Sequence, residues 1–333
     1  MRYGAFIPQG WRLDLVGIDR SEQWPTMLEV ARTIESLEYE SAWVFDHFHT
    51  FPVATQESSY EAWTLMAALA PTTSTVRLGQ MCTCNSYRHP AYLAKIAADI
   101  DVISNGRLEM GIGAGWYEAE YRGYGLDFPK ASVRIGQLEE GVEIMRRMWT
   151  EDVVDYAGRY YHLQGAISRP KPVQDSLPMW IAGGGERLTL RVAAKYADYT
   201  NFGLGLDEFI HKSGVLRTHT DAIGRDFDDI VRTSNFTSLI AETEAEVAAK
   251  VDEYVARIGS LGGDEVAAKV RRSTEEHGLV GTPEQVAAQL SSWADAGMGY
   301  TILYFPDVAY DRSSLELFAQ HVAPALRGRG DVR

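Results

Sequence analysis

Two patterns of apolar positions alternate along the chain. Short runs rich in strand-forming residues are separated by longer segments with apolar residues at helical spacing, which predicts a parallel sheet whose strands are joined by helices. The predicted strands cover residues 2–7, 41–46, 76–83, 107–113, 179–182, 198–201, 232–240 and 300–305. The predicted helices cover residues 25–38, 60–70, 90–104, 132–149, 186–196, 206–224, 244–258, 264–277 and 313–326, with a further helix start at 282–285.

Eight strand–helix units in this order favour a (β/α)8 TIM barrel that spans residues 1–333 as a single domain, an ordinary size for that fold. The competing fold, a doubly wound open sheet, normally uses about five to seven strands and fewer residues. Two connections are longer than a barrel needs and are predicted insertions. Residues 150–177 follow the fourth helix and contain a hairpin-like segment with Gly158 at its turn, and residues 241–281 follow the seventh strand.

Composition excludes several classes of protein. Apolar residues make up 45% of the chain and charged residues 23%, which is ordinary for a globular protein. The net charge of −14 repels polyphosphates, so we expect no nucleic-acid partner, although a local basic pocket can hold one small anion. We also expect no membrane span and no secretory signal, because no apolar stretch approaches about 20 residues. The only two cysteines lie in one apolar run, which favours a reducing cytoplasm over a disulfide framework.

The most reactive residue types follow the second predicted strand. Barrel enzymes place their sites where strands end and helices begin. Here Asp46 precedes His47, and an aspartate beside a histidine can orient the imidazole and set its protonation. The alternative for His47, and more so for His49, is a histidine satisfied by local hydrogen bonds. A metal site needs further histidines from later strands, which the chain lacks, with Asp307 the only possible extra ligand.

The third and fourth predicted strands end in small residues. Cys82 and Cys84 point to the same face of a regular strand, with too few partners for zinc, and inert buried thiols are the alternative for Cys84. Glycines at 111, 113 and 115 let a flat ring or a phosphate approach the backbone. This glycine spacing is weak by itself, because it lacks the dinucleotide-binding pattern.

The fifth predicted strand ends in Gly183, Gly184 and Gly185, directly before a predicted helix. Free N–H groups at a helix start, with the positive end of the helix dipole, make an anion-binding site. A simple tight turn is the alternative.

These segments, in this order, resemble the luciferase-like monooxygenase superfamily and its F420-dependent branch, in particular an actinobacterial group of probable F420-dependent oxidoreductases. The resemblance covers nearly the whole chain. The matching segments are residues 43–48, 77–79, 88–90, 106–108, 113–118, 181–184, 197–198 and 281–286. It implies a barrel of the bacterial luciferase-like type, an oxidoreductase activity, and coenzyme F420, with FMN as the alternative cofactor. It also implies a homodimer.

The resemblance assigns roles residue by residue. Asp46 and His47 match the pair beside the deazaflavin ring. Met81, Cys82 and Thr83 match the segment that backs the ring, with a non-proline cis peptide between the first two. The remaining cofactor-binding positions are Ala114, Gly115 and Tyr117 in the loop over the cofactor, and Ala182, Gly183 and Gly184 near its phosphate.

The departures concern the substrate pocket. Phe51 occupies the position of a tryptophan in the sugar-phosphate dehydrogenases of this branch, and Trp116 occupies that of their catalytic glutamate. The segment around Asn201 lacks their phosphate-binding lysine, so glucose-6-phosphate dehydrogenase activity is not expected.

The resemblance implies hydride transfer between deazaflavin C5 and a small, apolar organic substrate, with His47 moving the proton and Asp46 orienting His47. The alternatives are an FMN-dependent monooxygenase that uses O2 and a flavin-binding protein without turnover.

Overall fold

Eight parallel strands close into a barrel in the computed structural model, which describes residues 1–203 and 205–328. Closure follows from β9, at the end of the strand order, which pairs with β8 on one side and with β10 on the other. In order around the barrel the strands are β1 (Arg2–Phe6), β2 (Ser41–Val44), β3 (Arg77–Gln80) continued by β4 (Thr83–Cys84), β5 (Leu108–Gly113), β8 (Met179–Ala182), β9 (Tyr199–Asn201), β10 (Val231–Ile240) and β12 (Tyr300–Tyr304). The predicted (β/α)8 barrel is confirmed.

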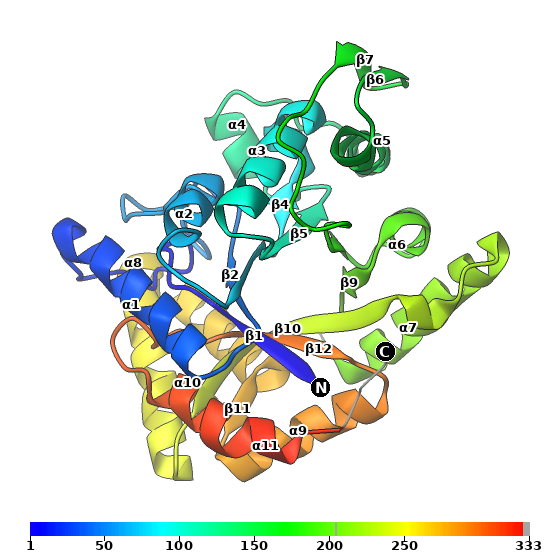
Figure 1. The fold of residues 1–333 in the computed structure, drawn as a ribbon. Helices are drawn as coiled ribbons and strands as arrows, with labels where there is room; N and C mark the ends of the chain where they lie inside the picture. Colours follow the sequence, from blue (N-terminus) through cyan, green and yellow to red (C-terminus); the bar gives the residue numbers. More distant parts are fainter. Residues whose placement is uncertain (204, 329–333) are drawn as a thin grey trace.

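Helices surround the strands (Figure 1). They are α1 (Arg20–Ser36), α2 (Ala62–Leu69), α3 (Pro90–Ile103), α4 (Glu118–Gly123), α5 (Ala131–Thr150), α6 (Thr189–Tyr196), α7 (Leu206–Ile223), α8 (Glu244–His277), α9 (Pro283–Asp295), α10 (Ser313–Leu317) and α11 (Ala323–Ala325), with short turns η1 (Asn85–Tyr87), η2 (Phe227–Asp229) and η3 (Phe318–Val322). None of the helices in the described ranges has the length and apolar character that crossing a membrane requires.

Large side chains fill the interior of the barrel. Trp43 of β2 is fully buried and its ring lies 4.7 Å from that of Trp180 on β8. Gly4 and Gly79 on the two neighbouring strands make room for Trp43, since a Cβ at Gly79 would lie 2.4 Å from its ring and one at Gly4 2.6 Å from its Nε1. Two glycines and one tryptophan thus form a volume-matched set, and we expect substitution at either glycine to disrupt the barrel.

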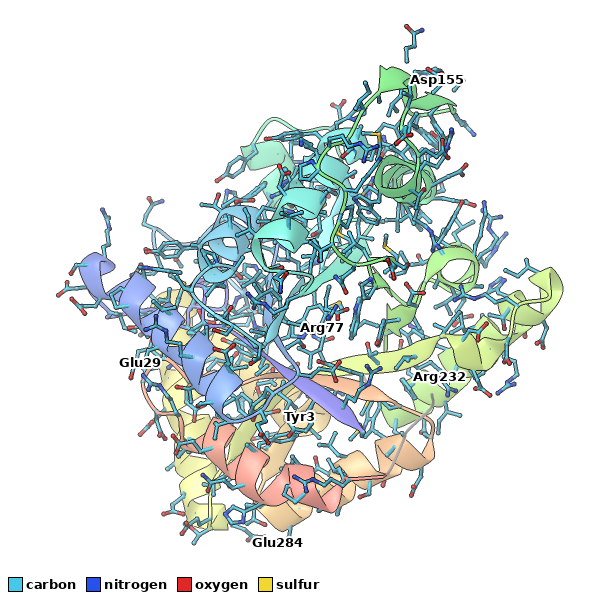
Figure 2. All side chains as sticks on the ribbon, in the orientation of Figure 1. Tyr3, Glu29, Arg77, Asp155, Arg232 and Glu284 are labelled. Atoms are coloured by element: carbon cyan, nitrogen blue, oxygen red, sulfur yellow. The ribbon has the colours of Figure 1, made fainter. Side chains whose placement is uncertain are left out.

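Both predicted insertions are present. In the first, β6 (Val154–Ala157) and β7 (His162–Ala166) form an antiparallel hairpin, and Figure 2 shows Asp155 of β6 at the outer edge of the molecule. In the second, α8 is divided at Gly263, whose φ of 77° is not helical, as the two predicted helical segments require. The short strand β11 (Leu279–Gly281), which the sequence pattern did not predict, then pairs with β10.

Several predicted boundaries are wrong. Helix α1 begins at Arg20, so Pro25 lies inside it and not in its first turn, because the polar residues before the apolar period are also helical. The third predicted strand is interrupted after Gln80 and resumes as β4. Helix α6 begins at Thr189, because residues 186–188 form a turn. Helix α4 was not predicted at all, and it positions a residue of the site.

Candidate functional site

A cavity of about 220 Å³ opens at the carboxyl ends of the barrel strands. Its lining comes from segments that follow β1, β2, β3, β4 and β5, from the last residues of β4, β8 and β9, and from within β10. The lining residues are Trp11, Phe45, Asp46, His47, Met81, Cys82, Cys84, Tyr87, Gly115, Trp116, Ala182, Asn201 and Asn235. Side chains from distant parts of the sequence therefore meet where barrel enzymes hold their substrates.

His47 is oriented by Glu120, a residue of the unpredicted helix α4. The imidazole Nδ1 lies 2.8 Å from Glu120 Oε2. One face of the ring stacks on Trp11, with centroids 4.1 Å apart and planes 4° apart. A carboxylate can only accept, so Nδ1 carries a proton, and in the neutral form of the ring the lone pair is on Nε2. The expectation that Asp46 orients His47 is wrong.

Glu120 is held as a buried carboxylate by several donors. Its Oε1 accepts from the backbone N–H groups of Phe48, at 2.7 Å, and His49, at 2.9 Å, while the Tyr87 hydroxyl donates to Oε2 at 2.6 Å. Burial acts to raise the pKa of Glu120, but the hydrogen bonds from His47, Tyr87 and His49 outweigh it, and the pKa lies below its ordinary value. The charged form is therefore the stable partner for His47.

Asp46 is fully engaged on the other side of the same loop. Arg88 donates to both of its oxygens, at 2.7 and 2.9 Å, and the backbone N–H of Cys84 donates at 2.9 Å. Arg88 also donates to Glu61 at 2.5 Å. Burial acts to lower the pKa of Arg88, yet the two carboxylates raise it above its ordinary value. This bidentate pair fixes the start of the loop that carries His47.

Aromatic side chains form one wall of the cavity. Trp116 stacks on Tyr117 with centroids 5.2 Å apart, and both rings meet Phe51 edge-on. Trp116 is 55% exposed, which leaves its ring accessible at the mouth. Trp116 and Trp11 line the cavity and give it its apolar character near His47, while Phe51 and Tyr117 pack against Trp116.

The segment between β3 and β4 lies beneath the cavity. Its Met81–Cys82 peptide bond is cis, at the position that the resemblance implies. Burial raises the pKa of the Cys84 thiol to about 12 and also raises that of Cys82, so both thiols stay protonated at neutral pH. Thr83 does not line the cavity, because it is buried and its hydroxyl donates to Gln80 at 2.7 Å.

The glycine run after β8 differs from the predicted anion site. Gly183 donates its N–H to the carbonyl of Asn201 at 2.9 Å, so that donor is already used. The turn before Thr189 separates the glycines from helix α6, so they do not open it directly. Lys212 of α7 covers Gly184 instead, since a Cβ there would lie 2.4 Å from its Nζ. Lys212 itself is paired with Glu208.

Eight of the predicted site residues line the cavity: Asp46, His47, Met81, Cys82, Gly115, Trp116, Ala182 and Asn201. Thr83, Ala114, Tyr117, Phe51, Gly183 and Gly184 lie beside it without lining it. The sequence reasoning missed the roles of Glu120 and Arg88, although Arg88 lies in the matching segment 88–90 and Glu120 lies two residues beyond the segment 113–118. No group of three or more metal-ligating side chains occurs within residues 1–203 and 205–328.

Comparisons with known proteins agree with this architecture. The model of the luciferase-like monooxygenase family matches residues 1–299. The chain is 28% identical to an F420-dependent glucose-6-phosphate dehydrogenase of Amycolatopsis mediterranei, over 91% of this chain and 95% of the relative. It is also 28% identical to the pyrimidine monooxygenase RutA of Acinetobacter baylyi, over 100% of this chain and 96% of the relative.

A solved structure of an F420-dependent secondary alcohol dehydrogenase, in complex with an F420-acetone adduct, superposes with a TM-score of 0.80 at 22% identity, covering 98% of this chain and 99% of that one.

Proposed function

Because the chain belongs to the luciferase-like monooxygenase family, we propose that it is an oxidoreductase that uses the deazaflavin coenzyme F420 and a small organic substrate. The observation that carries the cofactor is the 28% identity, over 91% of this chain, to an F420-dependent dehydrogenase. The substrate of that relative is not carried over, because the segment around Asn201 lacks the expected lysine.

The residues of the cavity suit a flat ring system. Met81 and Cys82 form one surface, and Gly115 and Ala182 add little bulk, so a planar molecule can approach the backbone. When bound, F420 supplies a ring carbon, C5, that accepts or releases a hydride.

His47 moves the proton that accompanies the hydride. With Nδ1–H donated to Glu120, the Nε2 lone pair takes a proton from a substrate hydroxyl during oxidation. In the reverse direction the imidazolium returns that proton to the substrate oxygen. Glu120 stabilises the positive charge on the ring in both directions.

Lys212 and Gly184 hold the phosphate end of the cofactor. Lys212 brings a positive charge over the glycine run, and Gly184 lacks the side chain that would block an approaching anion. This assignment replaces the helix start that the sequence suggested.

Parallel titration with F420 and FMN tests the proposal. We expect tight binding of F420, followed by its fluorescence, and weak or no binding of FMN. Preferential binding of FMN would reject the F420 assignment.

An FMN-dependent monooxygenase is the second candidate, favoured by the 28% identity to a pyrimidine monooxygenase over the full length of this chain. It requires O2 consumption with reduced FMN, which an oxygen electrode measures. Binding of either cofactor without any turnover would instead indicate a carrier protein.

We also propose that the chain forms a homodimer in the cytoplasm, by analogy with the family. A monomeric mass in light scattering at micromolar concentration would contradict the dimer.

A further inference from the structure

A second cavity, of about 330 Å³, lies beside the first. Its apolar wall is made by the aromatic rings of Phe51 and Tyr254 and by aliphatic side chains of the second half of α8. The lining residues are Arg12, Phe51, Pro52, Thr237, Tyr254, Val266, Lys269, Val270, Ser273 and Thr274. Two cations and four hydroxyl groups are among them, and no carboxylate is.

Arg12 has fewer partners in this cavity than a buried guanidinium normally requires. It hydrogen-bonds to the Tyr304 hydroxyl and makes a long contact of 3.5 Å to the Thr237 hydroxyl. Its Nε is buried without a partner, and no ion pair to a carboxylate occurs within the described residues. Burial acts to lower the pKa of Arg12, but Tyr254, Tyr304 and Asp14 raise it above its ordinary value, so the group stays charged. A buried charge without a partner is costly unless a ligand completes it.

Aromatic rings hold the guanidinium in place. Its Cζ lies 5.4 Å from the Trp11 ring, 5.1 Å from Tyr304 and 5.8 Å from Phe51. Such cation–π contacts orient the group without using its N–H donors. Arg12 thus lines the cavity while its Nε–H has no partner among the described residues.

The second cavity shares part of its wall with the first. Trp11 contacts Arg12 on one side and stacks on His47 on the other. Phe51 lines the second cavity and meets Trp116 of the first edge-on, with centroids 5.6 Å apart. The Trp11 and Phe51 rings, with centroids 5.7 Å apart, form the wall between Arg12 and His47.

We propose that the second cavity binds the carboxylate-bearing, apolar part of the substrate, with Arg12 pairing with the carboxylate and Lys269 adding positive charge at the rim. This inference rests on the proposed function for its account of why the ligand is a substrate. A guanidinium presents two parallel N–H donors that match a carboxylate, and the hydroxyl groups of Thr237 and Ser273 are close enough to line the same ligand.

The exposed Lys269 is a weaker contributor than Arg12. Its ammonium is 71% exposed and already pairs with Glu265 at 2.8 Å, so solvent screens its charge. Arg12 is thus the residue that determines the preference for an anion.

The test compares an acid with its neutral amide. Binding of 3-phenylpropanoate and of 3-phenylpropanamide is measured by calorimetry on the full chain, both without cofactor and after addition of F420. We expect the acid to bind at least about 10-fold more tightly, in line with hydrogen bonds between charged groups. Equal affinities, or no binding of the acid at millimolar concentration, would overturn the proposal without any variant.

Variants then assign the preference to Arg12. Arg12→Met should reduce the preference to about 2-fold or less, and Arg12→Lys should keep part of it, because the charge remains but the paired donors are lost. Arg159→Met removes the same charge from the exposed hairpin turn and should leave the preference unchanged. An undiminished preference in Arg12→Met would place the anion elsewhere.

A crystal with 3-(4-bromophenyl)propanoate shows the orientation, because anomalous scattering locates the bromine. The carboxylate should contact Arg12, and a carboxylate placed away from Arg12 overturns the proposal.

The anion-site proposal and the F420 proposal can fail independently of each other. If the acid preference holds and depends on Arg12 while the chain does not bind F420, the anion site stands and the cofactor assignment falls.

Discussion

The two sides of the barrel mouth differ in how many of their polar groups already have hydrogen-bond partners within the chain. On the side of β2 and α4, His47, Glu120, Asp46 and Arg88 are joined by short hydrogen bonds within the chain itself. On the side of β8 and β9, the glycine run offers backbone groups, with the Lys212 ammonium next to Gly184. In the proposed function, the first side would be ready for proton transfer before anything binds, and the second would be completed by a ligand.

This contrast has a physical basis. A catalytic imidazole must have one protonation pattern and one orientation, and buried partners fix both. A site for a phosphate must instead leave room and donors for an anion that brings its own charge. Changes on the first side should therefore lower turnover, and changes on the second should lower cofactor affinity.

Loss of the imidazole should give the largest effect. We expect His47→Ala to lower kcat by about 10²- to 10⁴-fold, the usual contribution of a general acid–base group, because the alanine side chain cannot carry the proton. F420 affinity should change little, which fluorescence titration measures. Unchanged turnover would show that His47 has only a structural role. The two sides would then not differ in their effect on kcat.

Loss of the negative charge that orients His47 should come next. In Glu120→Gln the amide cannot accept from every donor that now surrounds the carboxylate, and Nδ1 of His47 can be left facing another donor. We expect kcat to fall roughly 10- to 100-fold, corresponding to the ~1–3 kcal/mol of an unsatisfied buried polar group. KM and F420 affinity should be nearly unchanged, a separation that general destabilisation would not produce.

The same variant has a signature in the pH dependence of stability. The folded pKa of Glu120 lies below its ordinary value, so its contribution is fully present above the unfolded pKa of about 4.3 and is lost as the pH falls through the folded value. Urea unfolding should therefore show a wild-type advantage over Glu120→Gln at pH 7 that shrinks below about pH 4. An advantage that does not change with pH would exclude a charged Glu120.

The barrel was predictable because the alternation of apolar patterns is repeated eight times and tolerates errors at single boundaries. His47, Trp116 and Asn201 were predictable as neighbours because strand ends meet at one edge of a barrel. The partner of His47 was not, because Glu120 lies on a six-residue helix too short to give a periodic signal. Asp46 is adjacent to His47 in sequence, but adjacent side chains on an extended segment point apart, and Asp46 turns toward Arg88.

On the second side, Gly184→Val should weaken F420 binding while kcat at saturating cofactor is retained. The new side chain displaces the Lys212 ammonium and occupies the space above the glycine run. We expect roughly a 10-fold rise in the F420 Kd, because about 1.4 kcal/mol of binding free energy corresponds to a factor of ten.

Lys212→Met should give a smaller change, about 5-fold, because the charge of Glu208 already offsets part of the positive charge of the lysine. Its effect should diminish at high salt, whereas that of Gly184→Val should not. Unaltered F420 binding in both variants would move the phosphate away from this side of the mouth.

The smallest effect should come from Cys82. It lies near the side of β2 and α4 but makes no hydrogen bond to His47, Glu120, Asp46 or Arg88. Its thiol pKa is raised by burial, so no thiolate is available at neutral pH, and no hydrogen bond of its Sγ is found within the described residues. We therefore expect Cys82→Ala to keep kcat within about 2-fold of wild type, far from the 10²-fold or greater loss of a group that takes part in the chemistry.

Cys84→Ala is the matched comparison, because the Cys84 Sγ contacts the Tyr121 hydroxyl at 3.0 Å and its removal leaves that hydroxyl without this partner. Cys84→Ala should cost more stability than Cys82→Ala in urea unfolding, since participation in the contact network, and not position at the mouth, determines what a side chain contributes. A large loss of turnover in Cys82→Ala alone would show that the thiol itself acts on the substrate.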